Sequence, residues 1–337
     1  MKKSSLRTGS LFVSWMLILA LSVTSCKKDN NPIKFPRGTF PDTTTTALSD
    51  LNSAYDDYNL NLYQLYNNFG LLFSSNRGTS GGKFDLFPGA VSFTWDQTNG
   101  AFGYGSGTST DAFLNALATR ANTSGNDYGP YSFFSTVDGY EYLMLSSENI
   151  SGNLDFYYLR NLPKITSDIP SISGPFAATL LNSSGDDVYI SFDTNQDTAY
   201  YSSNASGNFD IYLKKRPSEA NMVSWLGGSY SAGTSIDSLN SSKDDKCPFV
   251  VKKVMVFVSN RDGGMGGFDL YYAIYNHGKW STPINFGPDI NTSYNEYRPV
   301  FANLNDYTNT LLMFSSDRPG GKGGYDIYFR GVTIESE

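Results

Sequence analysis

Histidine and cysteine are scarce in this sequence: its 337 residues contain one His and two Cys. One histidine excludes a histidine-rich metal cluster and any mechanism that needs two imidazoles. Two cysteines exclude a disulfide framework and a four-cysteine zinc site. Charged residues are also few, at 17% against a usual quarter. The 15% of aromatic residues excludes a disordered chain, and the many Tyr, Ser, Thr, Asn and Gly favour an all-β protein with many turns.

A long hydrophobic run is missing as well. The most apolar stretch, residues 11–23, has 13 residues and follows three basic residues. A membrane-spanning helix needs about 20 apolar residues, so this pattern predicts a signal peptide. The sequence VTSC at residues 23–26 ends this stretch and resembles a bacterial lipobox, which predicts lipid attachment at Cys26. The alternative is an ordinary signal peptide followed by an incidental cysteine.

The residues after Cys26 indicate an outer-membrane lipoprotein. No Asp follows Cys26 directly, a pattern similar to outer- rather than inner-membrane sorting, and Lys28-Asp29 loosely resembles the surface-export tag of Bacteroidetes lipoproteins. We expect a signal peptide over 1–25, a lipidated cysteine and flexible tether over 26–46, and a folded body over 47–337. The tether is expected from its three prolines and its threonine run. The lipid anchor makes the membrane the first partner, with the body facing the periplasm or the cell surface.

Acidic residues exceed basic ones, and the excess grows when the signal peptide is removed. Residues 1–25 hold three cations and no acid, so the remainder has 22 basic and 32 acidic residues and a net charge of −10. Nucleic-acid binding is disfavoured, because phosphate contacts need Lys and Arg. Cys247 would be the only thiol besides the lipidated one, and we expect it to be a small apolar filler in the fold.

One sequence unit occurs five times. It consists of an apolar strand, a Ser pair or Ser-Asn, a Gly-rich turn, and then an aromatic residue or Leu followed by Asp, an apolar residue and an aromatic one. The aligned aspartates, at spacings of 70, 55, 59 and 57, are Asp85, Asp155, Asp210, Asp269 and Asp326. A search for internal repeats comes before other assignments, because a repeat of this length defines the architecture.

A second motif precedes each of these units. It is an Asn with an acid five positions later, and the Asn residues are Asn52, Asn122, Asn182, Asn240 and Asn291. The matching acids are Asp57, Asp127, Asp187, Asp245 and Glu296. Each repeat has room for four short strands, with the Gly-rich loop as a hairpin. The sequence therefore predicts a single five-bladed β-propeller of four-stranded antiparallel blades, with residues 93–110 as an insertion after the first blade.

The repeated residues are expected to serve structure. An Asp after a Gly-rich turn can accept hydrogen bonds from turn amides that would otherwise be unsatisfied. The alternative is a set of Ca²⁺ sites, although each loop supplies only one or two carboxylates. A fivefold array argues against catalysis, which needs one asymmetric constellation. Arg77, Arg261 and Arg318 occur in three of the five loops, where we expect them to hydrogen-bond the loop, with ligand binding as the alternative.

The repeats resemble a known family. The stretch FSSDRPGG at residues 314–321, followed by GYDIY at 324–328, looks like the WD40-like repeat called PD40 of TolB-like propellers. The stretch WSTPINFG at 280–287 is similar to the same family. The match is close in the last two repeats and weaker in the others. This resemblance implies a propeller and non-catalytic protein interaction at the bacterial envelope, with no cofactor.

Two classes of function remain. The first is an envelope-anchored, non-catalytic lipoprotein that binds a protein or a glycan. Trp95, at the start of the expected insertion, is its candidate ligand contact, whereas Trp225 and Trp280 are expected to pack between blades. The alternative is a propeller glycoside hydrolase with a pair of carboxylates in the central funnel. The acids outside the two motifs form no recognisable signature, so the sequence favours the non-catalytic protein and leaves the ligand and the oligomeric state open.

Overall fold

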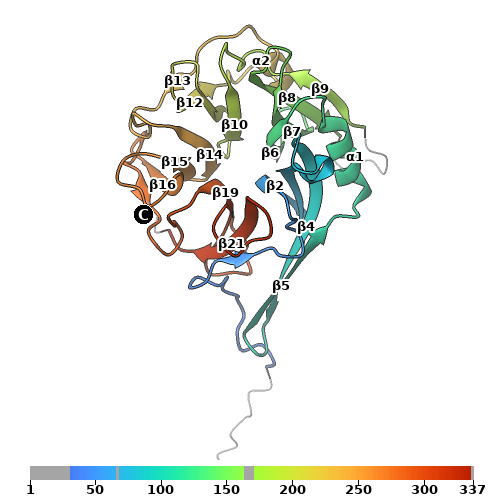
Figure 1. The fold of residues 1–337 in the computed structure, drawn as a ribbon, viewed down its shortest axis with the longest axis vertical. Helices are drawn as coiled ribbons and strands as arrows, with labels where there is room; N and C mark the ends of the chain where they lie inside the picture. The colour runs from blue at the N-terminus through green and yellow to red at the C-terminus, as the bar shows by residue number, and fades with distance from the viewer. Residues whose placement is uncertain (1–30, 66–67, 163–170, 335–337) are drawn as a thin grey trace, which may run out of the picture.

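The computed structural model describes residues 31–65, 68–162 and 171–334, and it is a ring of five β-sheets (Figure 1). The signal peptide and Cys26 lie outside the described residues. Each sheet is antiparallel and has four strands in radial order, and the fourth sheet has one further short strand. The predicted all-β, five-bladed propeller with four-stranded antiparallel blades is confirmed.

The blades follow one another along the chain. Blade 1 contains β2 (Asp57–Leu65), β3 (Asn68–Ser75), β4 (Asp85–Asp96) and β5 (Ala101–Thr108). Blade 2 contains β6 (Asp127–Phe134), β7 (Glu141–Glu148), β8 (Leu154–Asn161) and β9 (Ser173–Ala177). Blade 3 contains β10 (Asp187–Phe192), β11 (Thr198–Ser203), β12 (Asp210–Lys215) and β13 (Thr234–Ser235).

Blade 4 contains β14 (Asp245–Val251), β15 (Val254–Ser259), β16 (Asp269–Asn276), β17 (Lys279–Trp280) and β18 (Ile284–Asn285). Blade 5 contains β19 (Glu296–Ala302), β20 (Thr310–Ser316) and β21 (Asp326–Val332). The first strand of each blade faces the ring axis. We call the end where these inner strands begin the acid end, because each begins with the acid of the second motif.

The N-terminal segment closes the ring. The short strand β1 (Thr46–Ala47) pairs with β21 and supplies the outer strand of blade 5. Before it, Gly38 forms a bridge with Tyr307, and the fully buried Phe40 stacks on the Tyr307 ring at 3.9 Å between centroids. The Lys34 and Phe35 backbone N–H groups also donate to the Gln97 carbonyl at 2.9 Å, so the segment expected to be a flexible tether contacts the propeller from Lys34 onwards.

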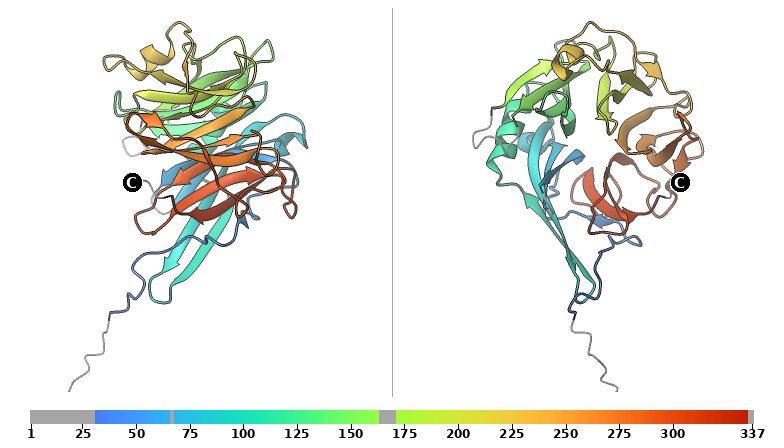
Figure 2. Two further views of the ribbon diagram at one scale, coloured as in Figure 1. Left: turned by 90° about the vertical axis from the view of Figure 1, so that its left-hand side faces the viewer. Right: turned by 180° about the vertical axis from the view of Figure 1, so that it is seen from behind.

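Residues 93–110, expected to be an insertion after blade 1, instead form the end of β4 and the strand β5 of blade 1 itself. Strands β4 and β5 pair from Gly89–Thr108 to Asp96–Ala101 and extend beyond the ring beside the N-terminal segment (Figures 1 and 2). The helix α1 (Ala112–Ala121) follows, starts at an Asp111 side-chain cap and packs its apolar face against blades 1 and 2. A second helix, α2 (Met222–Leu226), and a 3₁₀ turn, η1 (Arg77–Thr79), complete the described helical elements.

Every inner strand contains a β-bulge near its start. The pairing register shifts in each blade two residues after the acid of the second motif. The residue there has a positive φ between 49° and 58° in all five blades, namely Asn59, Gly129, Tyr189, Cys247 and Arg298. Such φ values are uncommon for residues other than glycine. Their fivefold repetition identifies the bulge as part of the blade design.

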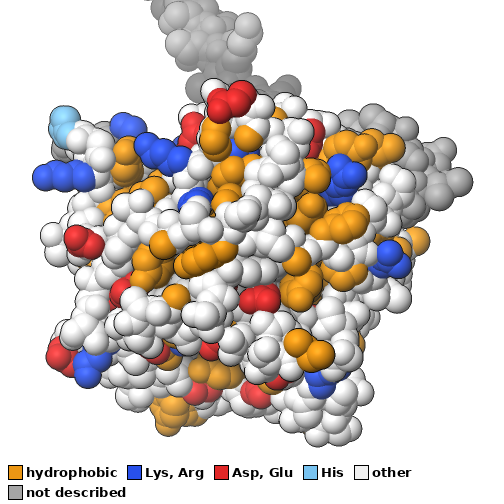
Figure 3. Space-filling model, turned by 90° about the horizontal axis from the view of Figure 1, so that it is seen from above, with side chains coloured by type: hydrophobic (Ala, Val, Ile, Leu, Met, Phe, Trp, Pro, Cys, Tyr) orange, Lys and Arg blue, Asp and Glu red, His pale blue; other side chains and the backbone are white. Residues whose placement is uncertain are grey.

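Large apolar and aromatic side chains fill the space between blades. The clusters join neighbouring sheets, as where Phe329 of blade 5 packs edge-on against Phe93 of blade 1 at 5.2 Å. Trp225 and Trp280, expected to pack between blades, are both buried, and Trp280 meets Tyr200 of blade 3. In the described part of the chain, no helix combines the length and apolar character needed to span a membrane. Acidic and basic side chains are scattered among hydrophobic ones on the side shown in Figure 3.

Candidate functional site

The asparagines of the second motif connect each blade to the one before it. Each side-chain amide accepts a hydrogen bond from one backbone N–H and donates one to the C=O of the same residue, at 2.7–3.2 Å. That residue always follows the aspartate of the first motif. The pairs are Asn52 with Ile327, Asn122 with Leu86, Asn182 with Phe156, Asn240 with Ile211, and Asn291 with Leu270. These residues are therefore placed as links between blades.

The acids that follow these asparagines form a buried ring. Asp57, Asp127, Asp187, Asp245 and Glu296 are all fully buried. Each carboxylate accepts a hydrogen bond from the backbone N–H of the residue after the motif Asn, at 2.5–2.9 Å. We call this set the acid ring. Burial raises the pKa of the Asp127 and Glu296 carboxyls, although these hydrogen bonds oppose the shift.

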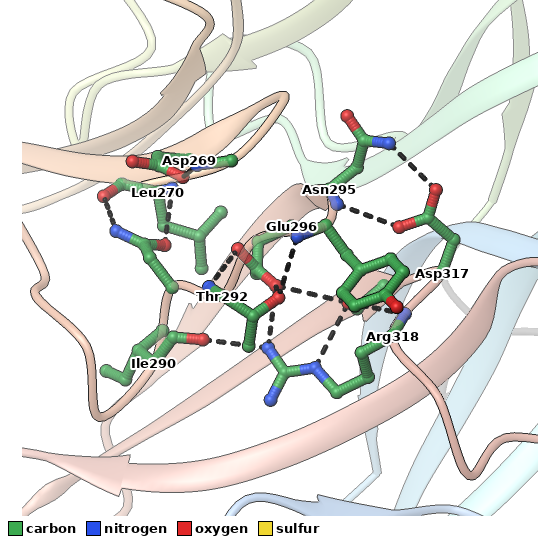
Figure 4. Close-up of polar contacts among 12 residues, drawn as sticks. Asp269, Leu270, Ile290, Thr292, Asn295, Glu296, Asp317 and Arg318 are labelled. Atoms are coloured by element: carbon green, nitrogen blue, oxygen red, sulfur yellow. Dashed lines mark hydrogen bonds and ion pairs between the residues drawn. The ribbon is translucent and has the colours of Figure 1, made fainter. Parts of the chain in front are cut away.

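Three blades neutralise their acid with the arginine of the Gly-rich loop. In blade 5, the Arg318 Nη2 atom lies 2.9 Å from the Glu296 Oε1 atom and 2.7 Å from the Ile290 carbonyl oxygen, as Figure 4 shows. Arg77 and Arg261 make the same contacts in blades 1 and 4, each 2.5 Å from its acid. These arginines occupy their loops as structural cations, in the hydrogen-bonding role expected from the sequence.

Each arginine also lies over two aromatic rings of its own blade. The Arg318 guanidinium carbon is 5.2 Å from the ring centres of both Phe314 and Tyr328. Arg261 lies 5.4 Å from Phe257 and 4.8 Å from Tyr271. In blade 1, the two rings are those of Phe73 and Phe87, at 5.0 and 5.7 Å. The repeat thus builds a guanidinium site from a carboxylate, a serine hydroxyl, a backbone carbonyl and two rings.

The aspartates of the first motif have different partners in different blades. Asp269 and Asp326 accept hydrogen bonds from turn amides at 2.6–3.2 Å, as expected for a turn residue. Asp85 instead lies 2.5 Å from Lys83, Asp155 accepts from Asn149, and Asp210 accepts from Asn208. Among the described residues, no group of three or more His, Cys, Asp or Glu side chains is placed to hold a metal ion. The Ca²⁺ alternative stays a prediction that this structure does not test.

The propeller axis is closed by side chains from the bulges. Arg298 of blade 5 is fully buried, donates from Nη2 to the Pro130 carbonyl of blade 2 at 3.1 Å, and lies 5.5 Å from the Tyr189 ring centre. Cys247 is buried beside them, and burial raises the pKa of its thiol to about 12. Within the described residues, the inner strands carry no acid besides the acid ring. The axis therefore lacks the carboxylate pair that the hydrolase alternative placed there.

A cleft lies off the axis, between blades 3 and 4. Its volume is about 690 Å³, and it is lined by the carboxylates of Asp193, Asp197 and Asp237. Asp193 begins the turn between β10 and β11 and accepts the backbone N–H of Asp197 at 3.0 Å and of Thr198 at 3.2 Å. Burial and the neighbouring Asp197 carboxyl raise the pKa of Asp193. The Asp193 carboxyl therefore holds its proton more tightly than an isolated aspartate does.

Aromatic and basic side chains complete this cleft. Trp280 packs edge-on against Tyr200 at 5.8 Å and against Tyr275 at 5.1 Å, and all three residues line the cleft. Lys215 and Lys252 contribute exposed cations. The sequence analysis missed this group of residues, because Asp193 and Asp197 belong to neither repeated motif. Their signal is the pair of acids within one hairpin turn, DTNQD at residues 193–197.

Trp95, the candidate ligand contact, lies at a second hollow. It belongs to β4, its indole N–H donates to the Phe35 carbonyl at 2.9 Å, and its ring lies against Gly38. Together with Gln97 and Tyr307 it lines a hollow of about 360 Å³. Its proposed role as a ligand contact is not tested by these contacts.

Comparisons with known proteins place the fold among solved structures. No family model matches the chain, and no curated protein does. A thermostable family-43 glycoside hydrolase shares 13% identity at a TM-score of 0.54, over 87% of this chain and 94% of that one. An α-L-arabinofuranosidase from Podospora anserina, solved with cellotriose, shares 12% identity at a TM-score of 0.52, over 88% of this chain and 98% of that one. The catalytic domain of a GH62 α-L-arabinofuranosidase from Coprinopsis cinerea shares 10% identity at a TM-score of 0.53, over 88% of this chain and 98% of that one.

These findings correct two expectations. The prediction of a PD40, TolB-like repeat protein is wrong, because no family model supports it and the similar solved structures are five-bladed glycoside hydrolases. In blade 5, the Ser-Asp-Arg motif supplies the guanidinium site and the Gly-Tyr-Asp motif supplies the turn aspartate. The prediction of a non-catalytic binding scaffold is corrected by the same findings, which favour the hydrolase alternative.

Proposed function

We propose that this chain is a glycoside hydrolase that works in the cleft between blades 3 and 4. The observation that carries the proposal is the Asp193 carboxyl in this cleft, whose pKa is raised by burial and by the neighbouring Asp197 carboxyl. General acid catalysis needs a carboxylic acid with a raised pKa next to the bond that breaks. The exposed Tyr275 ring lines the cleft and gives a surface on which a sugar ring can stack.

The reaction follows from two carboxyl roles. Asp193 donates its proton to the oxygen of the leaving sugar as the bond from the anomeric carbon to that oxygen breaks. Water forms the new bond to the anomeric carbon and releases its proton to the solvent of the cleft. Asp197 acts as a positioning residue, because its carboxyl keeps the proton on Asp193. The fold similarity to α-L-arabinofuranosidases supports an arabinofuranoside as the first substrate to test.

The test is release of reducing sugar from arabinan and arabinoxylan, and of nitrophenol from p-nitrophenyl α-L-arabinofuranoside. We expect Asp193→Asn to lower kcat at least a hundredfold while the protein keeps its melting temperature. Asp262→Asn, on an exposed loop of blade 4, is the matched control and should leave kcat unchanged. Equal activity of the Asp193→Asn variant and the native protein would contradict this site. No release from any of the three substrates would overturn the assignment to arabinofuranoside hydrolysis.

A further inference from the structure

Blade 3 lacks the arginine that fills the loop of blades 1, 4 and 5. The shared register of the strand pairs aligns Ser203 with Ser75 and Ser316, so the position of Arg77 and Arg318 is occupied by Ala205. A hollow of about 230 Å³ lies where the guanidinium stands in the other blades, lined by Asp187, Tyr201, Ser203, Ala205 and Tyr212 among others.

The partners of the missing guanidinium are all retained. Asp187 is the acid-ring member of blade 3 and is fully buried, and Ser203 stands where Ser75 bonds Arg77. Tyr201 and Tyr212 take the places of Phe257 and Tyr271. Their ring centres are 6.0 Å apart with planes at 28°, against 6.0 Å and 27° for Phe257 and Tyr271 in blade 4.

One carboxylate oxygen in the hollow is unpaired. The Asp187 Oδ2 atom accepts the Ser183 backbone N–H at 2.5 Å, but Oδ1 is buried and has no hydrogen-bond partner among the described residues. The Ser203 hydroxyl lies close enough to lower the pKa of Asp187, but not in hydrogen-bond geometry to Oδ1. In blades 1 and 4, the corresponding Oδ1 atom binds the arginine Nη2 at 2.5 Å. A buried, unpaired carboxylate oxygen is costly, so the hollow is built for a cation.

Blade 2 shows that an absent arginine does not by itself leave such a hollow. Asn149 stands at the arginine position there and donates to Asp155. The acid-ring member of blade 2, Asp127, accepts a hydrogen bond from the Thr123 hydroxyl on Oδ1 at 3.1 Å. Leu145 stands where blade 4 has the aromatic ring of Phe257. The carboxylate of blade 2 therefore has hydrogen-bond donors within its own blade. Blade 3 instead has the two rings of Tyr201 and Tyr212 and an unpaired carboxylate oxygen on Asp187.

We infer that the hollow of blade 3 binds a guanidinium group from outside the chain, such as an arginine side chain. The carboxylate would accept the N–H donors, and the guanidinium plane would lie against Tyr201 and Tyr212, as the chain's own arginines do in three other blades. The exposed Tyr230 borders the hollow and gives the ligand a third ring. This site lies at the acid end of the ring, and the inference does not depend on the proposed hydrolase activity.

The test uses calorimetry of the full chain with Nα-acetyl-arginine amide and its neutral isostere Nα-acetyl-citrulline amide. We expect saturable binding of the arginine compound and at least tenfold weaker binding of the citrulline compound. Ala205→Arg should supply the guanidinium from within, raise the melting temperature and weaken binding at least tenfold. Ile150→Arg, which adds the same charge at an exposed loop position of blade 2, should bind as the native protein does.

The remaining outcomes decide between ligand sources or against the site. A peptide with one central arginine that binds at least tenfold more tightly than the amide indicates a polypeptide ligand, whereas equal affinity indicates a small guanidinium compound. Asp187→Asn should weaken binding at least tenfold without lowering the melting temperature of the free protein. Unchanged binding in both Ala205→Arg and Asp187→Asn, or equal binding of the citrulline compound, would overturn the inference.

Discussion

Arg318 and Glu296 form an ion pair inside the propeller, with 2.9 Å between Nη2 and Oε1 and with the carboxylate fully buried. The pair connects the start of the inner strand of blade 5 to its Gly-rich loop. The same pair occurs in blades 1 and 4. It therefore fixes the loop at the acid end. Blade 3 lacks the pair but keeps the two aromatic rings, and a hollow lies there.

Removing the arginine of such a pair should destabilise the protein strongly. We expect Arg318→Met to lower the free energy of unfolding by about 3 kcal/mol, because Glu296 is left as an uncompensated buried charge. Urea unfolding monitored by circular dichroism measures this change. Lys243→Met is the control, since its pair with Asp262 is 4.0 Å long and exposed on both sides, and it should cost less than about 0.5 kcal/mol. Equal losses in both variants would contradict the structural role of the buried pair.

Asp187 should make stability depend on pH in the absence of a bound cation. Burial raises its pKa in the folded protein to about 6, above the ordinary 3.8. The folded state therefore binds the proton more tightly than the unfolded state, so this stabilising contribution is complete below pH 4 and is lost as the pH rises through 6. The shift corresponds to on the order of 3 kcal/mol.

The difference between the native protein and Asp187→Asn isolates this carboxyl from other titrating groups. We expect the native protein to lose stability relative to the variant between pH 4 and pH 7, as measured by urea unfolding at each pH. A constant difference across that range would mean that the pKa of Asp187 is not raised in the folded state.

Asn52 should be critical for closing the ring. Its amide bonds both the N–H and the C=O of Ile327, at 2.9 and 3.1 Å, and so joins the first blade to the last. Asn52→Ala leaves two buried backbone groups unpaired, which should lower the free energy of unfolding by about 2 to 3 kcal/mol. Asn305→Ala, at an exposed position, is the control and should change it by less than about 0.5 kcal/mol.

The bulge of blade 2 depends on glycine. At Gly129, φ is +57°, and an added Cβ would lie 2.7 Å from the Tyr189 ring at the axis. Gly129→Ala should therefore lower the melting temperature by more than Gly139→Ala, where φ is also positive, at +77°, but the space is open. A difference of about 1 to 2 kcal/mol is expected in denaturant unfolding. Equal effects of the two substitutions would show that the Tyr189 ring moves to make room for the added methyl group.

The architecture was predictable because each blade repeats two short motifs. The motif asparagine and the turn aspartate, which are Asn291 and Asp326 in the last repeat, recur in all five repeats. The strand-forming residues between them allow only short antiparallel strands. The bulges were missed, although proline stands three residues after the acid at Pro130, Pro248 and Pro299. Proline within a strand marks an edge or a bulge, so this signal was available.

The candidate sites were less predictable, because they arise from departures from the repeat. Asp193 and Trp280 are 87 positions apart in the sequence and share a cleft only because blades 3 and 4 are neighbours in the ring. The Ala205 side chain has no polar group. It is informative only because blades 1, 4 and 5 have an arginine at the equivalent position. A search for motifs finds residues that recur in every blade. The unpaired carboxylate of Asp187 instead results from Ala205, which stands where three other blades have an arginine.

The closure of the ring by β1 also sets how the molecule responds to a mechanical load. The N-terminal segment enters along blade 5, and β1 is held to β21 through two residue pairs, Thr46 with Phe329 and Ala47 with Tyr328. A pull on the N-terminus acts first on the hydrogen bonds from Lys34 and Phe35 to the Gln97 carbonyl in the β4–β5 hairpin of blade 1, and then on Phe40 and this short seam. Forced unfolding should therefore begin with detachment of residues 34–47, before any inner strand is displaced.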